Sequence, residues 1–155
     1  MNADQTEDLV RRVLKRVPKF YSEDAVKLLM LTWAIESDGG KYIRQLGGGP
    51  ALGYWQVEPA TMRDIYDNFL VFRRNLSNDI LLATGVGQPN EWHLEVNIAY
   101  NIIMARLVYW RSPDPIPTTD EGRAKYHNEI YNGGRDNYSR PDWQVALAKY
   151  RLYCL

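Results

Sequence analysis

The segment of residues 25–35 limits the possible folds more than any other, because it is apolar on almost every side. Ser22 precedes it and can cap free backbone amides, while Glu23 and Asp24 suit the positive end of a helix dipole. An Asp-Gly-Gly sequence at residues 38–40 ends the helix. A helix without a polar face belongs in the middle of a domain. The remaining elements are therefore expected to pack around it.

Further helices are predicted on both sides of this segment. The first predicted helix spans residues 4–17. It has apolar residues at helical spacing, and Asp4 with Glu7 fits a capping box at its start. Residues 41–55 are irregular and glycine-rich, which permits turns and leaves room for a short hairpin. The other predicted helices span residues 59–76, 77–83, 91–110 and 119–131, and a last one opens at Pro141. The chain has no linker or repeat, so residues 1–155 are expected to form a single all-α domain.

Charge and hydropathy exclude several classes of partner. The chain has 19 basic and 19 acidic residues, so no overall field attracts nucleic acid or an anionic membrane. No apolar run reaches the roughly 18 residues that a membrane span requires. The N-terminal sequence MNADQTEDL has neither the basic nor the apolar region of an export signal. We expect a chain made in a reducing cytoplasm, without nucleic acid binding or membrane insertion.

No metal ion or cofactor is expected. The only cysteine, Cys154, can form neither a disulfide within the chain nor a cysteine metal cluster, and is interpreted as a free structural thiol. His93 and His127 lie in polar helical surroundings without the spacing of metal ligands. Surface or capping roles are predicted for both histidines.

Glu36 is the candidate catalytic residue. It lies at the C-terminal end of the apolar helix, where desolvation by the core and the negative end of the helix dipole both favour a protonated carboxyl. A carboxylic acid that stays protonated near neutral pH is what a general acid requires. On this residue alone, a glutamate that reaches solvent at a helix end is the simpler interpretation. The sequence that follows favours catalysis.

Several short motifs, in order, resemble the soluble lytic transglycosylases and goose-type lysozymes. They are Glu36-Ser37, then Ala51-x-Gly53-Tyr54-Trp55-Gln56-Val57-x-Pro59-x-Thr61, and finally Tyr131-Asn132-Gly133. The family pattern has Glu-Ser, a Gly-Leu-Met-Gln-x-x-Pro-x-Thr-like segment, and later Tyr-Asn-Ala-Gly. Asn97-Ile98 is also similar to an Asn-Ile pair of the family. The resemblance spans most of the chain, from about residue 33 to 133.

The resemblance implies a lysozyme-like fold, with the glycine-rich loop at the active site, that acts on peptidoglycan glycan strands. The bond cleaved is the β-1,4 bond between N-acetylmuramic acid and N-acetylglucosamine. Glu36 would protonate the glycosidic oxygen, then take the proton of the muramic C6 hydroxyl, which gives a 1,6-anhydro product. One carboxyl acts first as acid and then as base, so no second carboxylate is needed.

The resemblance also implies roles for the neighbouring residues. Gln56 would face the sugar amides, and Tyr131 would hold the Glu36 carboxyl through a phenol hydrogen bond. Ser37 would support the turn after the acid, and Asn132 would shape that wall of the cleft.

Tyr54 and Trp55 replace the Leu-Met that is usual in the family. Both are candidate substrate contacts; for Trp55, stacking on a sugar and filling the core are both open interpretations. Two glycines, Gly133 and Gly134, stand where the family has Ala-Gly, which is a mild departure.

Two alternatives to a transglycosylase remain open at this point. Hydrolysis with inversion needs a second carboxylate, about 6.5–9.5 Å from the first, to place a water molecule. Asp38, Glu58 and Asp64 are candidates for that role. A non-catalytic structural or adaptor protein that keeps the fold is the other alternative, since fold alone does not establish activity.

The lack of an export signal, disulfides and a wall-binding module resembles bacteriophage lytic proteins more than periplasmic enzymes. The chain is then expected to be made in the host cytoplasm and to act on the cell wall. It would do so as a free endolysin or as a virion component, with virion proteins as partners in the second case.

Overall fold

The computed structural model describes residues 1–132 and 142–155, and their regular elements are all helical. The α-helices are α1 (Ala3–Lys15), α2 (Glu23–Glu36), α3 (Pro59–Asn68), α4 (Arg74–Thr84), α5 (Glu91–Val96), α6 (Ile98–Trp110), α7 (Asp120–Ile130) and α8 (Asp142–Cys154). Short 3-10 helices are η1 (Pro18–Phe20), η2 (Leu46–Gly48) and η3 (Leu70–Phe72). The described residues form no strand, so the all-α prediction is confirmed. In place of a hairpin, the 41–57 segment contains two isolated bridges, Arg44–Leu52 and Leu52–Val57.

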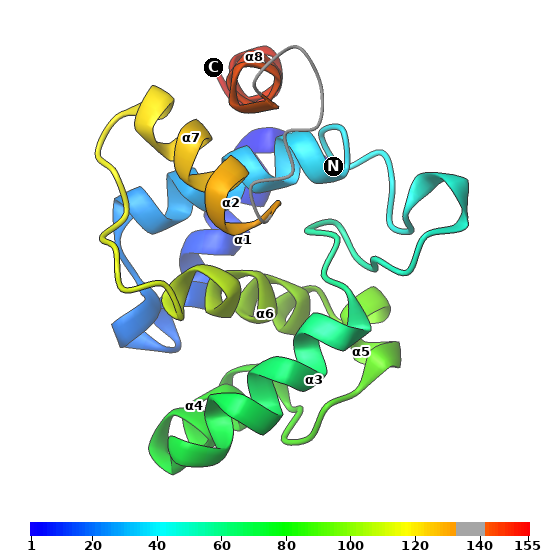
Figure 1. The fold of residues 1–155 in the computed structure, drawn as a ribbon, viewed down its shortest axis with the longest axis vertical. Coiled ribbons are helices and arrows are strands. Elements are labelled where there is room, and N and C mark those ends of the chain that lie inside the picture. Colours follow the sequence, from blue (N-terminus) through cyan, green and yellow to red (C-terminus); the bar gives the residue numbers. More distant parts are fainter. Residues whose placement is uncertain (133–141) are drawn as a thin grey trace.

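Helix α2 occupies the middle of the fold, as its sequence predicts. It packs against α1, α6, α7 and α8, which surround it in Figure 1. Nine of its residues are buried, from Ala25 to Ala34 with Lys27 excepted. The Ser22 hydroxyl caps its start and accepts a hydrogen bond from the Ala25 amide at 3.0 Å. The buried hydrophobic residues of the helices around it form one cluster.

The prediction of one continuous helix over residues 59–76 is wrong, because helix α3 ends at Asn68. In a continuous helix Ile65, Phe69 and Phe72 would share a face. Leu70, which the pattern also places inward, is buried at 2% exposure, but Phe72 is 77% exposed. The break therefore leaves Phe72 at the surface, and α4 follows in a new direction beside α3 in the lower part of Figure 1. The Arg73 guanidinium covers the Phe69 ring at 3.8 Å from its centroid.

The predicted helix of residues 91–110 is also interrupted. Asn97 has extended backbone angles, and its side chain accepts a hydrogen bond from the Tyr100 amide at 3.0 Å. Its amide group also donates to the Thr84 carbonyl at 3.0 Å. Asparagine competes with the helical backbone for hydrogen bonds and favours an N-cap. Helix α5 therefore ends at this residue and α6 begins after it.

The ends of the chain differ slightly from expectation. Helix α1 begins one residue before Asp4, and its cap is Asn2, whose side chain accepts from the Gln5 amide at 3.1 Å. Pro141 lies outside the described residues. Cys154 near the end of α8 is a free thiol packed on the core, and burial raises its pKa to about 12. The interpretation of Cys154 as a structural thiol is confirmed.

Within residues 1–132 and 142–155, no helix combines the length and the apolar character needed to cross a bilayer.

We predict that Asn97→Ala lowers the free energy of unfolding by about 1–2 kcal/mol, because it removes the cap of α6 and the bond to Thr84. Urea unfolding followed by circular dichroism measures the change. Asn75→Ala, at an exposed position of α4, is the control and should change stability by less than about 0.5 kcal/mol. Equal effects of the two substitutions would show that Asn97 does not hold the junction.

Candidate active site

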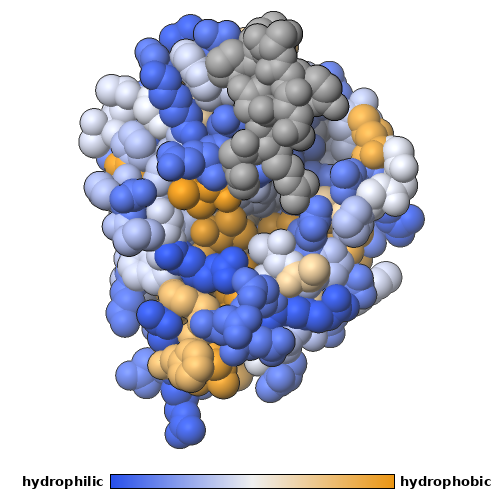
Figure 2. Space-filling view, in the orientation of Figure 1, coloured by the Kyte–Doolittle hydropathy of each residue, from blue (hydrophilic) through white to orange (hydrophobic). Residues whose placement is uncertain are grey.

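A cleft of about 550 Å³ opens beside the C-terminal end of α2. Its walls are the segment after α2, the start of α3, part of α6 and the end of α7, with Lys149 of α8 at one side. Figure 2 shows this face hollowed near its centre, with hydrophobic surface inside and hydrophilic residues around it. The polar residues that line the cleft and matter for chemistry are Glu36, Asp38, Gln56, Glu58, Tyr131 and Asn132.

Glu36 is the last residue of α2, and its side chain is 21% exposed. The turn behind it is fixed by Ser37, which is fully buried. The Ser37 hydroxyl donates to the Trp33 carbonyl at 2.8 Å and accepts from the Gly40 amide at 3.0 Å. The expected support of the turn by Ser37 is therefore confirmed, but a fully buried side chain is not available to contact substrate. Ser37 acts by holding Glu36 at the edge of the core.

His127 is fully buried and lies directly behind Glu36, so the prediction of a surface or capping role is wrong. Its Nε2 is 3.3 Å from Glu36 Oε1. Its Nδ1 is 2.8 Å from the Tyr109 hydroxyl, and its ring stacks on Tyr131 with centroids 5.3 Å apart. His93, by contrast, is half-buried and contacts the Asn97 side chain at 3.3 Å.

One sequence signal could have located His127. It precedes Tyr131 by four residues, so the two side chains share a helix face. If Tyr131 borders the cleft, His127 must lie on the same side. The polar composition of the rest of α7 hid that relation.

The Tyr131 hydroxyl donates to the Trp55 carbonyl, which differs from the predicted bond to the Glu36 carboxyl. The ring is packed between His127 and Tyr109, at a centroid distance of 5.2 Å from the latter. Burial raises the pKa of Tyr131 well above its ordinary value, and the nearby Glu36 adds to the rise. The phenol thus stays neutral. Tyr131 lines the cleft beside Glu36 and ties the end of α7 to the loop.

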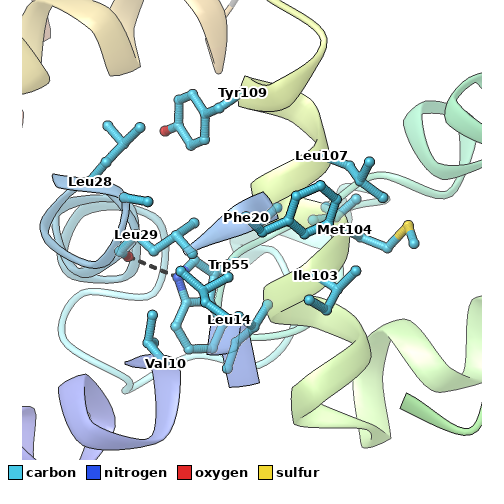
Figure 3. Packing of buried hydrophobic residues seen from close by; sticks show 14 of the residues in the cluster. Val10, Leu14, Phe20, Leu28, Leu29, Trp55, Ile103, Met104, Leu107 and Tyr109 are labelled. Atoms are coloured by element: carbon cyan, nitrogen blue, oxygen red, sulfur yellow. Dashed lines mark hydrogen bonds between the residues drawn. The ribbon is translucent and has the colours of Figure 1, made fainter. Parts of the chain in front are cut away.

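The Trp55 side chain is fully buried, so of its two open interpretations the core one is confirmed, and Trp55 as a substrate contact is wrong. Figure 3 shows its indole among hydrophobic residues of the core, with a dashed line to the carbonyl of Leu29. That hydrogen bond, from Nε1, is 2.8 Å long. The apolar core takes the large ring because burial of an aromatic side chain is strongly favourable and its N–H has a partner. Tyr54 is partly buried against the core and does not line the cleft.

Gln56 lines the cleft, on a tight turn that begins at Gly53. Its φ of 51° is uncommon for a residue other than glycine, asparagine or aspartate, so the turn is strained at this point. The Gln56 side-chain amide donates to the Gly53 carbonyl at 2.9 Å. A strained residue in a cleft is a feature of many functional sites.

Asn101 of α6, which sequence reasoning missed, holds this turn from behind. It is 2% exposed; its Oδ1 accepts from the Trp55 amide at 2.9 Å, and its Nδ2 donates to the Leu52 carbonyl at 3.1 Å. Gly53 lies so close that a Cβ there would be 2.4 Å from the Asn101 side chain. Nothing in the local sequence of α6 marks Asn101 as a clamp for a loop almost fifty residues earlier.

Asn132 lines the cleft next to Tyr131, as expected for a wall residue. Its backbone amide donates to the His127 carbonyl at 3.3 Å. Gly133 and Gly134, which complete the sequence motif, lie outside the described residues.

The three candidates for a second carboxylate differ in their surroundings. Asp38 is bound by the Tyr153 hydroxyl at 2.7 Å, by Lys41 at 3.1 Å and by Lys149 at 3.3 Å, which together hold its pKa at about 2. It is a weak base. Asp64 pairs with Arg111 at 2.7 Å and does not line the cleft. Glu58 does line it, and no described residue forms an ion pair with it.

Comparison with models of protein families, with curated proteins and with solved structures finds no match.

We predict that Gly53→Ala destabilises the protein more than Gly47→Ala. The two glycines have nearly the same φ, 80° and 79°, so both substitutions carry a left-handed backbone cost of about 1 kcal/mol. Only at Gly53 does the new methyl group meet a buried side chain, which adds about 1–3 kcal/mol. Urea unfolding of the two variants measures the difference. Equal losses would mean that Asn101 moves away at no cost.

We predict that Asp38→Asn destabilises the protein at about pH 5 and much less near pH 2. The folded pKa of Asp38, about 2, lies below the unfolded value of about 3.9, so its contribution is present above about pH 4 and is lost as the pH falls through 2. Asparagine tolerates the φ of 52° at this position. The expected loss is about 1 kcal/mol, since the side chain is 27% exposed. Unfolding curves of both proteins at the two pH values test it; a constant difference would contradict the assignment.

Proposed function

We propose that this chain cleaves the β-1,4 bond between N-acetylmuramic acid and N-acetylglucosamine in peptidoglycan, as a lytic transglycosylase with Glu36 as its catalytic residue. We further propose that the arrangement of its helices is lysozyme-like, with the loop between α2 and α3 as the active-site loop.

The observation that supports the proposal is the common position of residues that are far apart in sequence. Glu36, Gln56, Tyr131 and Asn132 line one cleft. Parts of the three motifs that resemble the lytic transglycosylases thus line the same cleft as the Glu36 carboxyl group. A half-buried acid at the edge of a core suits proton transfer to a bound substrate, because water around it is limited and the backbone behind it is fixed.

In this mechanism Glu36 transfers its proton to the glycosidic oxygen as the bond to C1 of the muramic acid breaks. The C6 hydroxyl of the same sugar then attacks C1, and its proton returns to the Glu36 carboxylate. The 1,6-anhydro ring forms without water. Gln56 and Asn132 offer amide groups to the N-acetyl and hydroxyl groups of the glycan.

A second candidate function is hydrolysis, and the position of Glu58 favours it as the alternative. Glu58 lies in the same cleft as Glu36, and Asp38 and Asp64 are each held by cations. A carboxylate in that position could activate a water molecule on the opposite face of the sugar. The product would then carry a reducing muramic end.

The biological setting that we propose is bacteriophage lysis or penetration of the wall during DNA entry. A virion protein that keeps this cleft without turnover is the non-catalytic alternative. It is disfavoured by the cost of keeping an acid at the edge of the core, on the order of 1–3 kcal/mol where a polar group is imperfectly paired.

We predict that Glu36→Gln abolishes cleavage of purified peptidoglycan, with a loss of at least about 100-fold, because an amide cannot donate the proton. Digestion by wild type, followed by mass spectrometry, identifies the product. Fragments lighter by one water than hydrolytic fragments indicate anhydro ends and a transglycosylase.

Two variants accompany this test. Glu129→Gln, an exposed position on α7, is the matched control and should keep full activity. Glu58→Gln should keep it as well if the enzyme is a transglycosylase, and should lose it if water is activated at Glu58. A folded wild type that leaves peptidoglycan intact would refute the enzymatic proposal.

A further inference from the structure

A chain of buried polar groups leads from the core to the Glu36 carboxyl. Thr32 Oγ1 lies 2.7 Å from the Tyr109 hydroxyl, which lies 2.8 Å from His127 Nδ1. On the other side of the same ring, Nε2 lies 3.3 Å from Glu36 Oε1. Thr32 and His127 are fully buried, and Tyr109 is 1% exposed. Bulk water does not reach Thr32, Tyr109 or His127, so the position of each of their protons matters.

The direction of each hydrogen bond in this series follows from its innermost member, Thr32. Thr32 Oγ1 is 2.8 Å from the Leu28 carbonyl oxygen, which can only accept. Two oxygens at that distance need a proton between them, so the Thr32 hydroxyl donates to Leu28. The Thr32 oxygen must then accept from the Tyr109 hydroxyl, and the Tyr109 oxygen from His127. His127 therefore carries a proton on Nδ1.

In a neutral ring with its proton on Nδ1, Nε2 has only a lone pair. It is buried and has no hydrogen-bond partner among the described residues, and Glu36 Oε1 lies 3.3 Å away. An ionised Glu36 would place a second lone pair against it at 3.3 Å. A carboxyl proton on Glu36 removes that conflict.

We propose that His127 is a positioning residue whose Nε2 accepts a hydrogen bond from the protonated Glu36 carboxyl, and so keeps that carboxyl protonated before substrate binds. This inference rests on the proposed function of Glu36 as the catalytic acid. Rotation of the carboxyl about its Cγ–Cδ bond turns the O–H from Nε2 toward the glycosidic oxygen. After the transfer, the carboxylate faces the Nε2 lone pair, which favours return of the proton from the C6 hydroxyl. One proton leaves and one returns.

The surroundings of the ring support a fixed orientation. Tyr131 stacks on His127, and Tyr109 is stacked between Tyr131 and Tyr126. The charged and titratable groups that act on the Tyr109 hydroxyl are Glu36 of α2, Arg106 of α6 and Tyr126 of α7. Lys149 of α8 lines the cleft with Glu36 and pairs with Asp38. Burial raises the pKa of Tyr109 well above its ordinary value, so its hydroxyl keeps its proton.

The first test locates the proton directly. The chain has only two histidines, so 15N-histidine labelling of the full protein gives a simple NMR spectrum, and His93→Gln assigns it. We expect His127 to show a protonated Nδ1 and a bare Nε2 near neutral pH. A proton on Nε2, or on both nitrogens, would overturn the proposal. This measurement does not depend on activity: if wild type fails to cleave peptidoglycan, the proposed function fails while the spectrum still decides the hydrogen-bond order.

The second test is the pH dependence of cleavage. Tyr109→Phe removes the acceptor of the Nδ1 proton without touching Glu36, so the ring is free to carry its proton on Nε2 and to stabilise the carboxylate. We expect kcat near neutral pH to fall on the order of tenfold with KM little changed. The alkaline limb of the profile should move to lower pH. Tyr126→Phe, whose hydroxyl bonds to the Asp114 carbonyl outside this chain of groups, is the control. Identical profiles of the two variants would overturn the proposal.

Discussion

Burial of α2 is the constraint on which the rest of the structure depends. Its side chains are apolar on almost all sides, so the helix is covered by α1, α6, α7 and α8. A helix covered in this way meets solvent only at its ends. Glu36 is the last residue of the helix and therefore emerges where the core gives way to the cleft. The backbone behind the carboxyl is held by Ser37, which makes its hydrogen bonds inside the protein. The result is a carboxyl group on a fixed backbone, 21% exposed at the wall of the cleft.

The loop that forms the opposite wall of the cleft is held from the core as well as by hydrogen bonds among its own residues. Trp55 inserts its indole beside α2 and donates to the Leu29 carbonyl, while Asn101 of α6 binds the backbone on either side of Gly53. Because these groups are buried, leaving any of them without a partner would cost roughly 1–3 kcal/mol. That cost keeps the turn in place and with it the strained Gln56. The same principle applies to Thr32, Tyr109 and His127 behind Glu36.

Two buried side chains and two helix ends differ from the sequence-based expectation for one physical reason: tertiary contacts outweigh local pattern. The neighbours in sequence leave Trp55 open between a sugar contact and the core, and predict a surface or capping role for His127, yet both side chains are fully buried. An aromatic ring in a loop can face either way, and only the space beside α2 decides. The helix breaks at Phe69 and Asn97 were missed because apolar spacing continues across them. At Asn97, side-chain hydrogen bonds outweigh helix propensity. After Asn68, the 3-10 turn η3 keeps Leu70 buried and leaves Phe72 exposed.

The sequence by itself determined that the chain is helical, that α2 lies at its centre, and that Glu36 stands at the end of that helix before a turn. Those features depend on local properties, namely apolar spacing, the Ser22 cap and the glycines at residues 39 and 40. Only the tertiary structure decided which polar groups surround Glu36. Tyr131 binds the Trp55 carbonyl and His127 faces the acid because α7 packs against α2 at one particular rotation. That rotation is set by the shapes of side chains from several helices at once, which no local pattern specifies.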